Sequence, residues 1–317
     1  MTTYTTAELK NYAMDRKTTG TPRKFMIFFD GCNNDCIHCF AGDKSKIGFD
    51  KAVAKALILK YPGTMAVFLT GGEPTLHPDL KEMIEFCRDN GRIPCLMTNA
   101  RTLSDAAFLD ELINLGLEGV IVPFHSHDAA VHNFMTNTDS FDETIKGIRN
   151  CTGNRETPTH KGNTFGVQLM LIVHKLNYLT IDKTLEFMCS LNPDVITIES
   201  LIFAGNTIDN QDELSVSISE VAIYLEKGFD VLINQGVPFA VNSFPLCLFR
   251  EKYWGYFYSH INDKIATNFK FKEESEIVTS GLSLAEKCAD CRMKGNCPGT
   301  WETYYSIFGD GEFNVIR

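Results

Sequence analysis

The sequence predicts an α/β fold, a partial (β/α)6 TIM-like barrel followed by a small C-terminal domain. Three observations predict it. Six short apolar runs alternate with helical patterns, and such a series forms a parallel sheet with right-handed crossovers. Six units are too few for a closed eight-stranded barrel, so we expect an open one. The alternation ends after residue 201, and a different pattern follows.

Each predicted element has a local signal. The six apolar runs, read as strands, are residues 24–30, 66–69, 93–98, 119–124, 165–173 and 195–201. The helical patterns between them are residues 50–60, 78–90, 104–115, 139–150 and 179–191. Ser104 and Ser140, each beside an aspartate, offer side-chain oxygens to the free N–H groups of a first helical turn. Gly116 stands where a helix should end.

Composition excludes several classes of protein. The chain has 317 residues, and 44% of them are hydrophobic, as in a globular protein with ample core. Its formal charge of -10 argues against nucleic-acid or anionic-membrane binding, because either would need a basic face. No segment has the ~20 consecutive apolar residues that span a bilayer. We therefore expect a cytoplasmic protein in which the eleven cysteines are metal ligands or reduced thiols rather than disulfides.

The chain divides into three predicted parts. Residues 1–23 form a polar N-terminal arm without the apolar run of a secretory signal. Residues 24–236 form the barrel, which includes a polar stretch at 206–213 and a helix at 219–235. Residues 237–317 form the C-terminal domain, with short strands and an aromatic-rich segment that we expect to pack in a core.

A cysteine motif directly follows the first strand. Cys32, Cys36 and Cys39 have C-x3-C-x2-C spacing on a predicted loop, so three thiolates can converge on one metal centre. A structural zinc site or a disulfide fragment would use the same residues. An iron–sulfur cubane normally takes four thiolates. Three cysteines therefore suggest a cluster that keeps one iron for an exogenous ligand.

A second motif decides between these readings. Gly71, Gly72 and Glu73 follow the second strand, where a glycine pair lets the backbone approach a ligand closely and a carboxylate can bind an ammonium group. Both motifs lie at carboxyl ends of strands, the edge at which parallel sheets bind ligands. In this order they resemble the motifs of the radical S-adenosylmethionine (SAM) enzymes.

The resemblance implies a SAM-binding [4Fe-4S] cluster held by the three cysteines, and cleavage of SAM to a 5'-deoxyadenosyl radical after reduction. It places the SAM amino group at the segment from Thr70 to Glu73. His38 matches a position near the adenine. Thr98 and Ser126 match positions that contact SAM, and Gln168 a position that faces SAM or substrate. An external one-electron reductant, such as flavodoxin or ferredoxin, is expected as a partner.

A second cysteine set lies near the C-terminus. Cys288, Cys291 and Cys297 have C-x2-C-x5-C spacing, and Cys247 lies upstream. Four thiolates can close a cubane completely, although a four-cysteine zinc site would need the same residues. The pattern resembles the twitch and SPASM extensions of radical SAM enzymes, which implies an auxiliary [4Fe-4S] cluster. The position of a further SPASM cysteine is occupied by Trp301, so one auxiliary cluster is expected. If Cys247 is not a ligand, it is a candidate hydrogen-atom donor.

Three functions are compatible with these motifs. The first is hydrogen-atom abstraction from a ribosomal peptide or protein side chain, giving a cross-link, an oxidation or an epimerisation. The short predicted N-terminal arm leaves no room for the leader-peptide-binding domain of many such enzymes. The second is therefore oxidation or epimerisation of a small polar metabolite, such as an aminocyclitol or sugar. A non-catalytic iron–sulfur protein is the third, but it gives Gly71, Gly72 and Glu73 no role.

Overall fold

The computed structural model describes residues 22, 24–261, 263–268, 277–279 and 281–317. The predicted N-terminal arm thus lies outside the described residues except for Pro22, whose carbonyl accepts a hydrogen bond from Thr64 Oγ1 at 2.6 Å. None of the described helices is both long and apolar enough to cross a bilayer.

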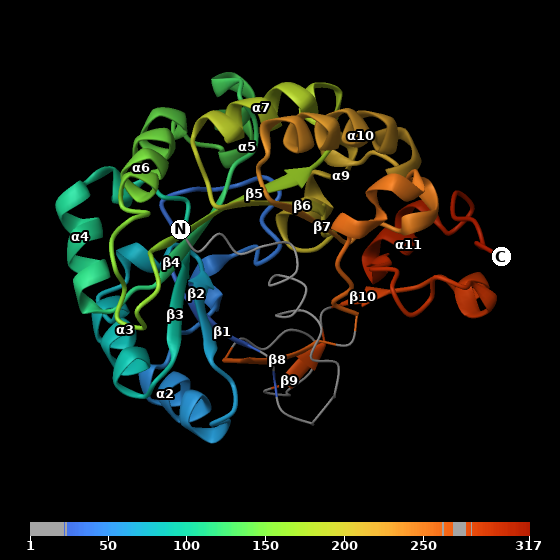
Figure 1. Cartoon of the computed structure of the whole chain (residues 1–317). Helices are drawn as coiled ribbons and strands as arrows, with labels where there is room; N and C mark the ends of the chain where they lie inside the picture. The colour runs from blue at the N-terminus through green and yellow to red at the C-terminus, as the bar shows by residue number, and fades with distance from the viewer. Residues whose placement is uncertain (1–21, 23, 262, 269–276, 280) are drawn as a thin grey trace.

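A curved sheet of nine strands forms the centre of the molecule, in the order β7-β6-β5-β4-β3-β2-β1-β8-β9 (Figure 1). All neighbouring strands pair in parallel except β9, which is antiparallel to β8. The strands are β1 (Lys24–Phe29), β2 (Ala66–Gly71), β3 (Ile93–Met97), β4 (Gly119–Pro123), β5 (Gly166–Val173), β6 (Val195–Ser200), β7 (Phe239–Asn242), β8 (Lys264–Thr267) and β9 (Ile277–Thr279). The predicted α/β class and partial, open barrel are confirmed.

Helices cover the outer face of this sheet (Figure 1). The helices of the described residues, which also include the short α8 and α9 after β6 and α11 near the C-terminal ribbon, are α2 (Lys51–Lys60), α3 (Leu80–Asp89), α4 (Ala106–Leu115), α5 (Ala129–Thr136), α6 (Phe141–Gly153), α7 (Ile181–Ser190), α8 (Asn206–Asp209), α9 (Gln211–Leu214), α10 (Ile218–Gln235) and α11 (Glu302–Phe308). A separate two-stranded ribbon pairs β10 (Leu282–Ser283) with β11 (Thr300–Trp301) near α11. The five helices predicted between strands are α2, α3, α4, α6 and α7, and the short helices α5, α8, α9 and α11 were not predicted.

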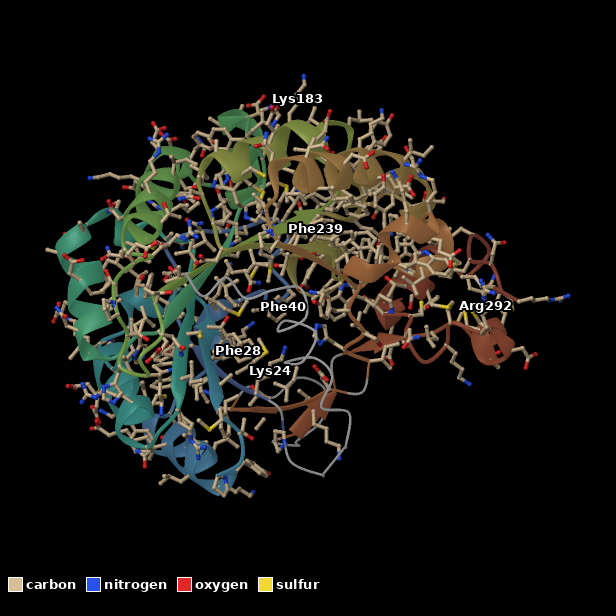
Figure 2. The ribbon with its side chains drawn as sticks, in the orientation of Figure 1. Lys24, Phe28, Phe40, Lys183, Phe239 and Arg292 are labelled. Atoms are coloured by element: carbon tan, nitrogen blue, oxygen red, sulfur yellow. The ribbon has the colours of Figure 1, made fainter. Side chains whose placement is uncertain are left out.

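The two faces of the sheet differ in burial. In β5, Val167, Leu169 and Leu171 are buried, whereas the alternating residues Gln168 and Met170 are only half-buried. Side chains in a strand alternate between faces, so the buried set packs under the helices and the other set lines the barrel interior. Figure 2 shows side chains filling the space around the sheet, with Phe28 and Phe40 close together near its middle.

Strands from beyond residue 236 complete both sides of the sheet. β7 pairs with β6, and β8 pairs with β1, so the sheet contains two more parallel strands than the six predicted. The predicted division of the chain at residue 236 stays a prediction, and the sheet itself crosses it. In the aromatic-rich segment, Tyr253 and Phe257 are buried against Phe229 of α10, as expected of a core.

The start of α6 differs from the prediction. Ser140 occupies the N-cap position, but its side chain accepts no hydrogen bond from the helix. Asn133 of α5 supplies the acceptor, because its Oδ1 accepts hydrogen bonds from the backbone N–H groups of Ser140 at 3.0 Å and Phe141 at 2.9 Å. In α4 the capping side chain is Asp105 rather than Ser104. The predicted end of α4 at Gly116 is confirmed by its left-handed backbone.

Candidate functional site

The first cysteine loop leaves the carboxyl end of β1. Its three thiols lie close enough to influence one another, because burial and then the neighbouring thiols of Cys39 and Cys32 raise the pKa of Cys36 to about 12. Burial also raises the pKa of Cys32, and the nearby carboxylate of Glu73 raises it further. The structure thus brings the two sequence motifs together at one edge of the sheet.

Two short helices hold the backbone of this loop. At the end of α5, the carbonyls of Thr136 and Met135 accept hydrogen bonds from the N–H groups of Asp35 at 3.1 Å and Ile37 at 3.0 Å. The cysteine loop is therefore hydrogen-bonded to the carboxyl end of α5, a helix that was not predicted from the sequence.

From the other side, α8 reaches the loop through Asn206. Its backbone N–H donates to the Cys39 carbonyl at 2.9 Å, and its Nδ2 donates to the Cys36 carbonyl at 2.9 Å. Gly205 precedes it with φ 58°, and a Cβ there would lie 2.5 Å from the Cys39 carbonyl oxygen. Sequence reasoning treated residues 206–213 only as a polar stretch. A glycine followed by amide and hydroxyl side chains was the available signal.

The glycines of the second motif serve a contact between loops. Gly72 N–H donates to the Phe29 carbonyl at 2.8 Å, and Glu73 N–H donates to the Gly31 carbonyl at 2.7 Å. A Cβ on Gly72 would lie 1.8 Å from the Gly31 carbonyl oxygen. Close approach was predicted toward a ligand, and the structure adds a second reason, the approach of this loop to the cysteine loop.

Glu73 is a buried carboxylate, 1% exposed. Its Oε1 accepts hydrogen bonds from the hydroxyls of Thr75 at 2.6 Å and Thr98 at 2.7 Å, and its Oε2 accepts one from Asn99 N–H at 2.7 Å. No ion pair neutralises it among the described residues. Burial raises its pKa although these hydrogen bonds act against the shift. A buried carboxylate without a counter-ion is suited to an ammonium group.

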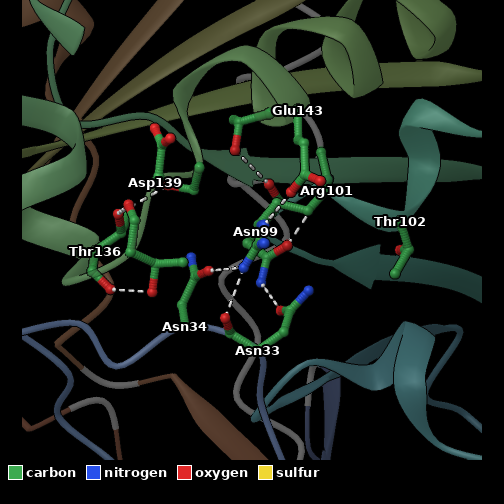
Figure 3. A network of polar contacts seen from close by, with 12 residues as sticks. Asn33, Asn34, Asn99, Arg101, Thr102, Thr136, Asp139 and Glu143 are labelled. Carbon is green, nitrogen blue, oxygen red and sulfur yellow. Dashed lines mark hydrogen bonds and ion pairs between the residues drawn. The ribbon is translucent and has the colours of Figure 1, made fainter.

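Asn99, whose backbone N–H donates to Glu73, belongs to a polar network that reaches the cysteine loop (Figure 3). Asn99 Nδ2 donates to Asn33 Oδ1 at 2.7 Å. Arg101 donates to the Asn33 carbonyl at 2.6 Å and to Asn34 Oδ1 at 2.9 Å, and it pairs with Glu143 of α6 at 2.6 Å. Since one guanidinium can hold several acceptors in fixed directions, the turn after β3 fixes the loop that carries the first cysteines.

His38 lies among other buried histidines. Its ring is 4.4 Å from that of His125, which is 5.3 Å from that of His132. Burial lowers the pKa of His38 to about 4, so the ring is neutral at pH 7. Its buried Nδ1 has no hydrogen-bond partner among the described residues, as is true of His125 Nδ1 and both ring nitrogens of His132.

The other residues predicted to contact SAM or substrate are Thr70, Ser126 and Gln168, and they do not all lie at the same edge of the sheet. Thr70, near the carboxyl end of β2, is 8% exposed, and Ser126, three residues after β4, is 1% exposed. Ser126 Oγ accepts a hydrogen bond from Asp128 N–H at 3.1 Å. Gln168 lies near the start of β5 rather than at its carboxyl end, and its Nε2 donates to Thr197 Oγ1 at 2.9 Å. The structure does not bring Gln168 to the edge at which the other site residues lie.

The second cysteine set lines one concave site. The four lining cysteines are Cys247, Cys288, Cys291 and Cys297. Burial raises the pKa of Cys247, with further contributions from the Cys288 and Cys291 thiols. Leu246 N–H donates to Cys297 Sγ at 3.5 Å, and Asn314 N–H donates to Cys247 Sγ at 3.4 Å.

The donor sets suit iron–sulfur clusters, which are held by cysteine thiolates and tuned by hydrogen bonds to sulfur. Within the described ranges, no three His, Cys, Asp or Glu side chains are grouped so as to hold a metal ion. Trp301, at the position of the missing SPASM cysteine, donates its indole N–H to the Ser200 carbonyl at 3.0 Å. It therefore joins the C-terminal segment to the end of β6.

An open parallel barrel, with a three-cysteine loop after its first strand and an uncompensated carboxylate after its second, defines a class of cofactor-dependent enzyme. The family model described as "Radical SAM superfamily" matches residues 26–188. The chain belongs to this superfamily and is an enzyme. Membership implies a [4Fe-4S] cluster and SAM as cofactors and requires an electron donor.

Curated relatives match the chain in part. It is 28% identical over 215 residues to Fe-coproporphyrin III synthase of Methanosarcina barkeri, covering 62% of this chain and 51% of that protein. It is 29% identical over 204 residues to a probable GTP 3',8-cyclase of Saccharolobus islandicus, covering 62% of each. The chain thus spans between half and two thirds of the length of these relatives.

Among solved structures, Streptococcus suis SuiB bound to S-adenosylmethionine matches with a TM-score of 0.65 and 14% identity, covering 93% of this chain and 75% of SuiB. SuiB bound to its precursor peptide SuiA matches with a TM-score of 0.59 and 14% identity, over 83% of this chain and 60% of SuiB. These likenesses establish the fold.

Proposed function

We propose that this radical SAM enzyme abstracts a hydrogen atom from a C–H bond of a ribosomal peptide or protein side chain and uses two [4Fe-4S] clusters to do so. The outcome is a cross-link, an oxidation or an epimerisation. The observation that carries the proposal is the presence of two separate cysteine sites in one molecule: the Cys32 and Cys39 thiols lie near enough to Cys36 to raise its pKa, and four cysteines line the second site.

Cys32, Cys36 and Cys39 would hold the first cluster, and the segment from Thr70 to Glu73 would hold the SAM amino group. The unneutralised carboxylate of Glu73 supports this assignment. Bound together, cluster and SAM supply the radical that removes a hydrogen atom. The chain's own residues position them: Thr98 and Asn99 orient Glu73, and Arg101 fixes the cysteine loop.

His38 and Ser126 remain proposed SAM contacts. His38 belongs to the cysteine loop, and its neutral ring, whose buried Nδ1 has no partner among the described residues, can stack on or hydrogen-bond a heterocycle. Gln168 stays a proposed contact of SAM or substrate, and its amide donates to Thr197 inside the barrel.

Cys247, Cys288, Cys291 and Cys297 would hold the auxiliary cluster. Support comes from their shared concave site and from two backbone N–H groups directed at sulfur. Cys247 accepts one of these hydrogen bonds, which favours a ligand over a hydrogen-atom donor, because N–H···S bonds stabilise thiolates. A complete four-thiolate cluster would accept an electron from the substrate, and flavodoxin or ferredoxin would reduce the first cluster.

The peptide assignment draws support from the likeness to SuiB, whose structure contains a precursor peptide. A second candidate is oxidation or epimerisation of a small polar metabolite. The names of the curated relatives favour it, since coproporphyrin and GTP are small molecules. The matches to these relatives cover 62% of the chain, whereas the match to SAM-bound SuiB covers 93% of it.

Iron and zinc analysis with electron paramagnetic resonance tests the cofactor assignment. Anaerobically reconstituted protein should contain about eight irons, and the Cys32, Cys36 and Cys39 triple alanine variant about four. Reduced parent protein should convert SAM to 5'-deoxyadenosine, and the triple variant should not. Four irons and one zinc in the parent would contradict the auxiliary cluster, and absence of SAM cleavage would contradict the proposed reaction.

A further inference from the structure

The interior face of β6 and β7 carries a pair of polar side chains that the cofactor sites do not use. Glu199 and Asn242 are direct partners in the parallel register of these strands. Asn242 Nδ2 donates to Glu199 Oε1 at 3.2 Å. This bond fixes the orientation of the amide, because the reverse orientation would set its oxygen against the carboxylate.

The pair has hydrogen-bond acceptors that no donor of the described residues fills. Asn242 is 9% exposed, and its buried Oδ1 has no hydrogen-bond partner in the part of the chain that the structure describes. Glu199 is half-buried, and among the described residues no cation pairs with it. Buried acceptors in folded proteins almost always have a donor, so a donor from outside the described chain is missing here.

Glu199 and Asn242 lie close in the chain to segments that lead to the two cysteine sites. Glu199 is the residue before Ser200, whose carbonyl accepts the Trp301 indole N–H. The segment that follows β6 reaches the Cys39 carbonyl through Asn206. Asn242 lies five residues before Cys247 in the sequence. The carboxyl ends of these two strands therefore stand between the proposed SAM site and the proposed auxiliary site.

Two apolar side chains adjoin the pair, and the polar Thr197, which lies two residues before Glu199 on β6, is already bonded to Gln168. Ile172 of β5 is the register partner of Glu199 on the opposite side from Asn242, and Ala240 lies two residues before Asn242 on the same face of β7. A carboxylate and an amide oxygen beside apolar side chains suit a cation that can donate several hydrogen bonds and carries an apolar stem.

We propose that Glu199 and Asn242 bind an ammonium or guanidinium group of the substrate, and so hold its reacting carbon between the two cysteine sites. This inference rests on the proposed function and narrows its substrate to amine- or guanidine-bearing compounds. A lysine or arginine side chain of a peptide and the amino group of an amino sugar share this chemistry.

The test uses three charged probes, each with an uncharged partner. They are Nα-acetyl-lysine amide with its norleucine analogue, Nα-acetyl-arginine amide with its citrulline analogue, and glucosamine with glucose. Binding to the reconstituted, unreduced protein with SAM is measured by ligand-observed NMR. Stimulation of 5'-deoxyadenosine formation is then measured after reduction.

At least one charged probe should bind about 10- to 100-fold more tightly than its partner, as expected for a charge-assisted hydrogen bond in a shielded site. In Glu199→Gln this ratio should fall below about 2-fold, with iron content unchanged. Glu213→Gln, a change at an exposed glutamate of α9, should keep the parent ratio. Tighter binding of the charged lysine or arginine probe would indicate a peptide substrate. Tighter binding of glucosamine than of glucose would indicate a small metabolite.

Equal binding of charged and uncharged probes, or an unchanged ratio in Glu199→Gln, would overturn the inference. Because binding is measured without reduction, this result is separate from a failure of the proposed function, which would appear as absence of 5'-deoxyadenosine in every sample.

Discussion

Gly72 owes its identity to a backbone contact. A Cβ there would lie 1.8 Å from the Gly31 carbonyl oxygen, and backbone cannot move aside as a flexible side chain can. We expect Gly72→Ala to destabilise the fold by about 1–3 kcal/mol and to lower the iron bound after reconstitution. Chemical denaturation and iron analysis measure both effects. Gly153→Ala is the control, because a Cβ at Gly153 would meet nothing within 4 Å, and an equal loss in both variants would contradict the explanation.

Glu73 provides the negative charge that the SAM amino group would meet. Removing one charge-assisted interaction at a buried site costs about 1.5–3 kcal/mol, so Glu73→Gln should weaken SAM binding about 10- to 100-fold. Equilibrium binding to reconstituted protein measures this change. Iron content should stay at the parent value, because Glu73 is not a proposed ligand, and the exposed change Glu111→Gln should alter neither quantity. Parental SAM affinity in Glu73→Gln would reject the assignment.

The pKa of Glu73 gives the same binding event a pH dependence. Burial raises this pKa above its ordinary value, so the free site takes up a proton at a higher pH than an exposed glutamate would. Acidification through the raised pKa removes the charge that an ammonium group needs. SAM binding should therefore weaken as the pH falls toward this pKa, and the Glu73→Gln variant should show a flatter profile between pH 8 and pH 5 in the same binding measurement.

At the scale of elements, a side chain of α5 caps the start of α6. Asn133 Oδ1 accepts two N–H groups at the start of α6, while the Ser140 hydroxyl accepts none of them. Loss of a capping side chain costs about 0.5–2 kcal/mol. Asn133→Ala should therefore lower the free energy of unfolding by more than Ser140→Ala does, as measured by denaturant titration. A larger loss of unfolding free energy in Ser140→Ala would instead support the prediction from the sequence that Ser140 caps α6.

Periodicity explains which elements could be predicted. The six long βα units carry apolar runs and helical spacing, and all six strands and five helices exist in the structure. β7 and β8 have four residues each, too few for a pattern, and they join the sheet through pairings with distant strands. The caps of α6 and the role of α8 depend on side chains from other elements, which spacing along the chain cannot reveal.

The candidate site was predictable where local sequence motifs form it, and not where distant segments meet. Two motifs at strand ends identified the cysteine loop and Glu73, because parallel strands deliver their carboxyl ends to one edge. Arg101, Asn206 and Asn242 were missed, since their significance comes from contacts with segments far away in the sequence. Gln168 was assigned by resemblance to a position that the fold places deeper in the barrel.

The whole molecule combines two cysteine sites, and single substitutions should separate their roles. Cys32→Ala should abolish SAM cleavage, because it removes a proposed ligand of the first cluster. Cys288→Ala should retain part of the cleavage but stop product formation, because the electron acceptor is lost. Chromatography of 5'-deoxyadenosine and mass spectrometry of the substrate measure the two steps. Cys151→Ala, at a buried thiol in α6, serves as the control. Full product formation by Cys288→Ala would reject the acceptor role.

The pairing of β1 with β8 also matters while the protein is being made. Phe28 N–H is held by Asn268 Oδ1, 240 residues away. At 5–20 residues per second, a ribosome needs roughly 12–48 s to synthesise that interval. During this time one edge of β1, with the sequence KFMIFF, has no strand beside it. An unpaired apolar edge can pair with other chains, so we expect the unfinished chain to associate with other chains more readily before β8 is made than after it.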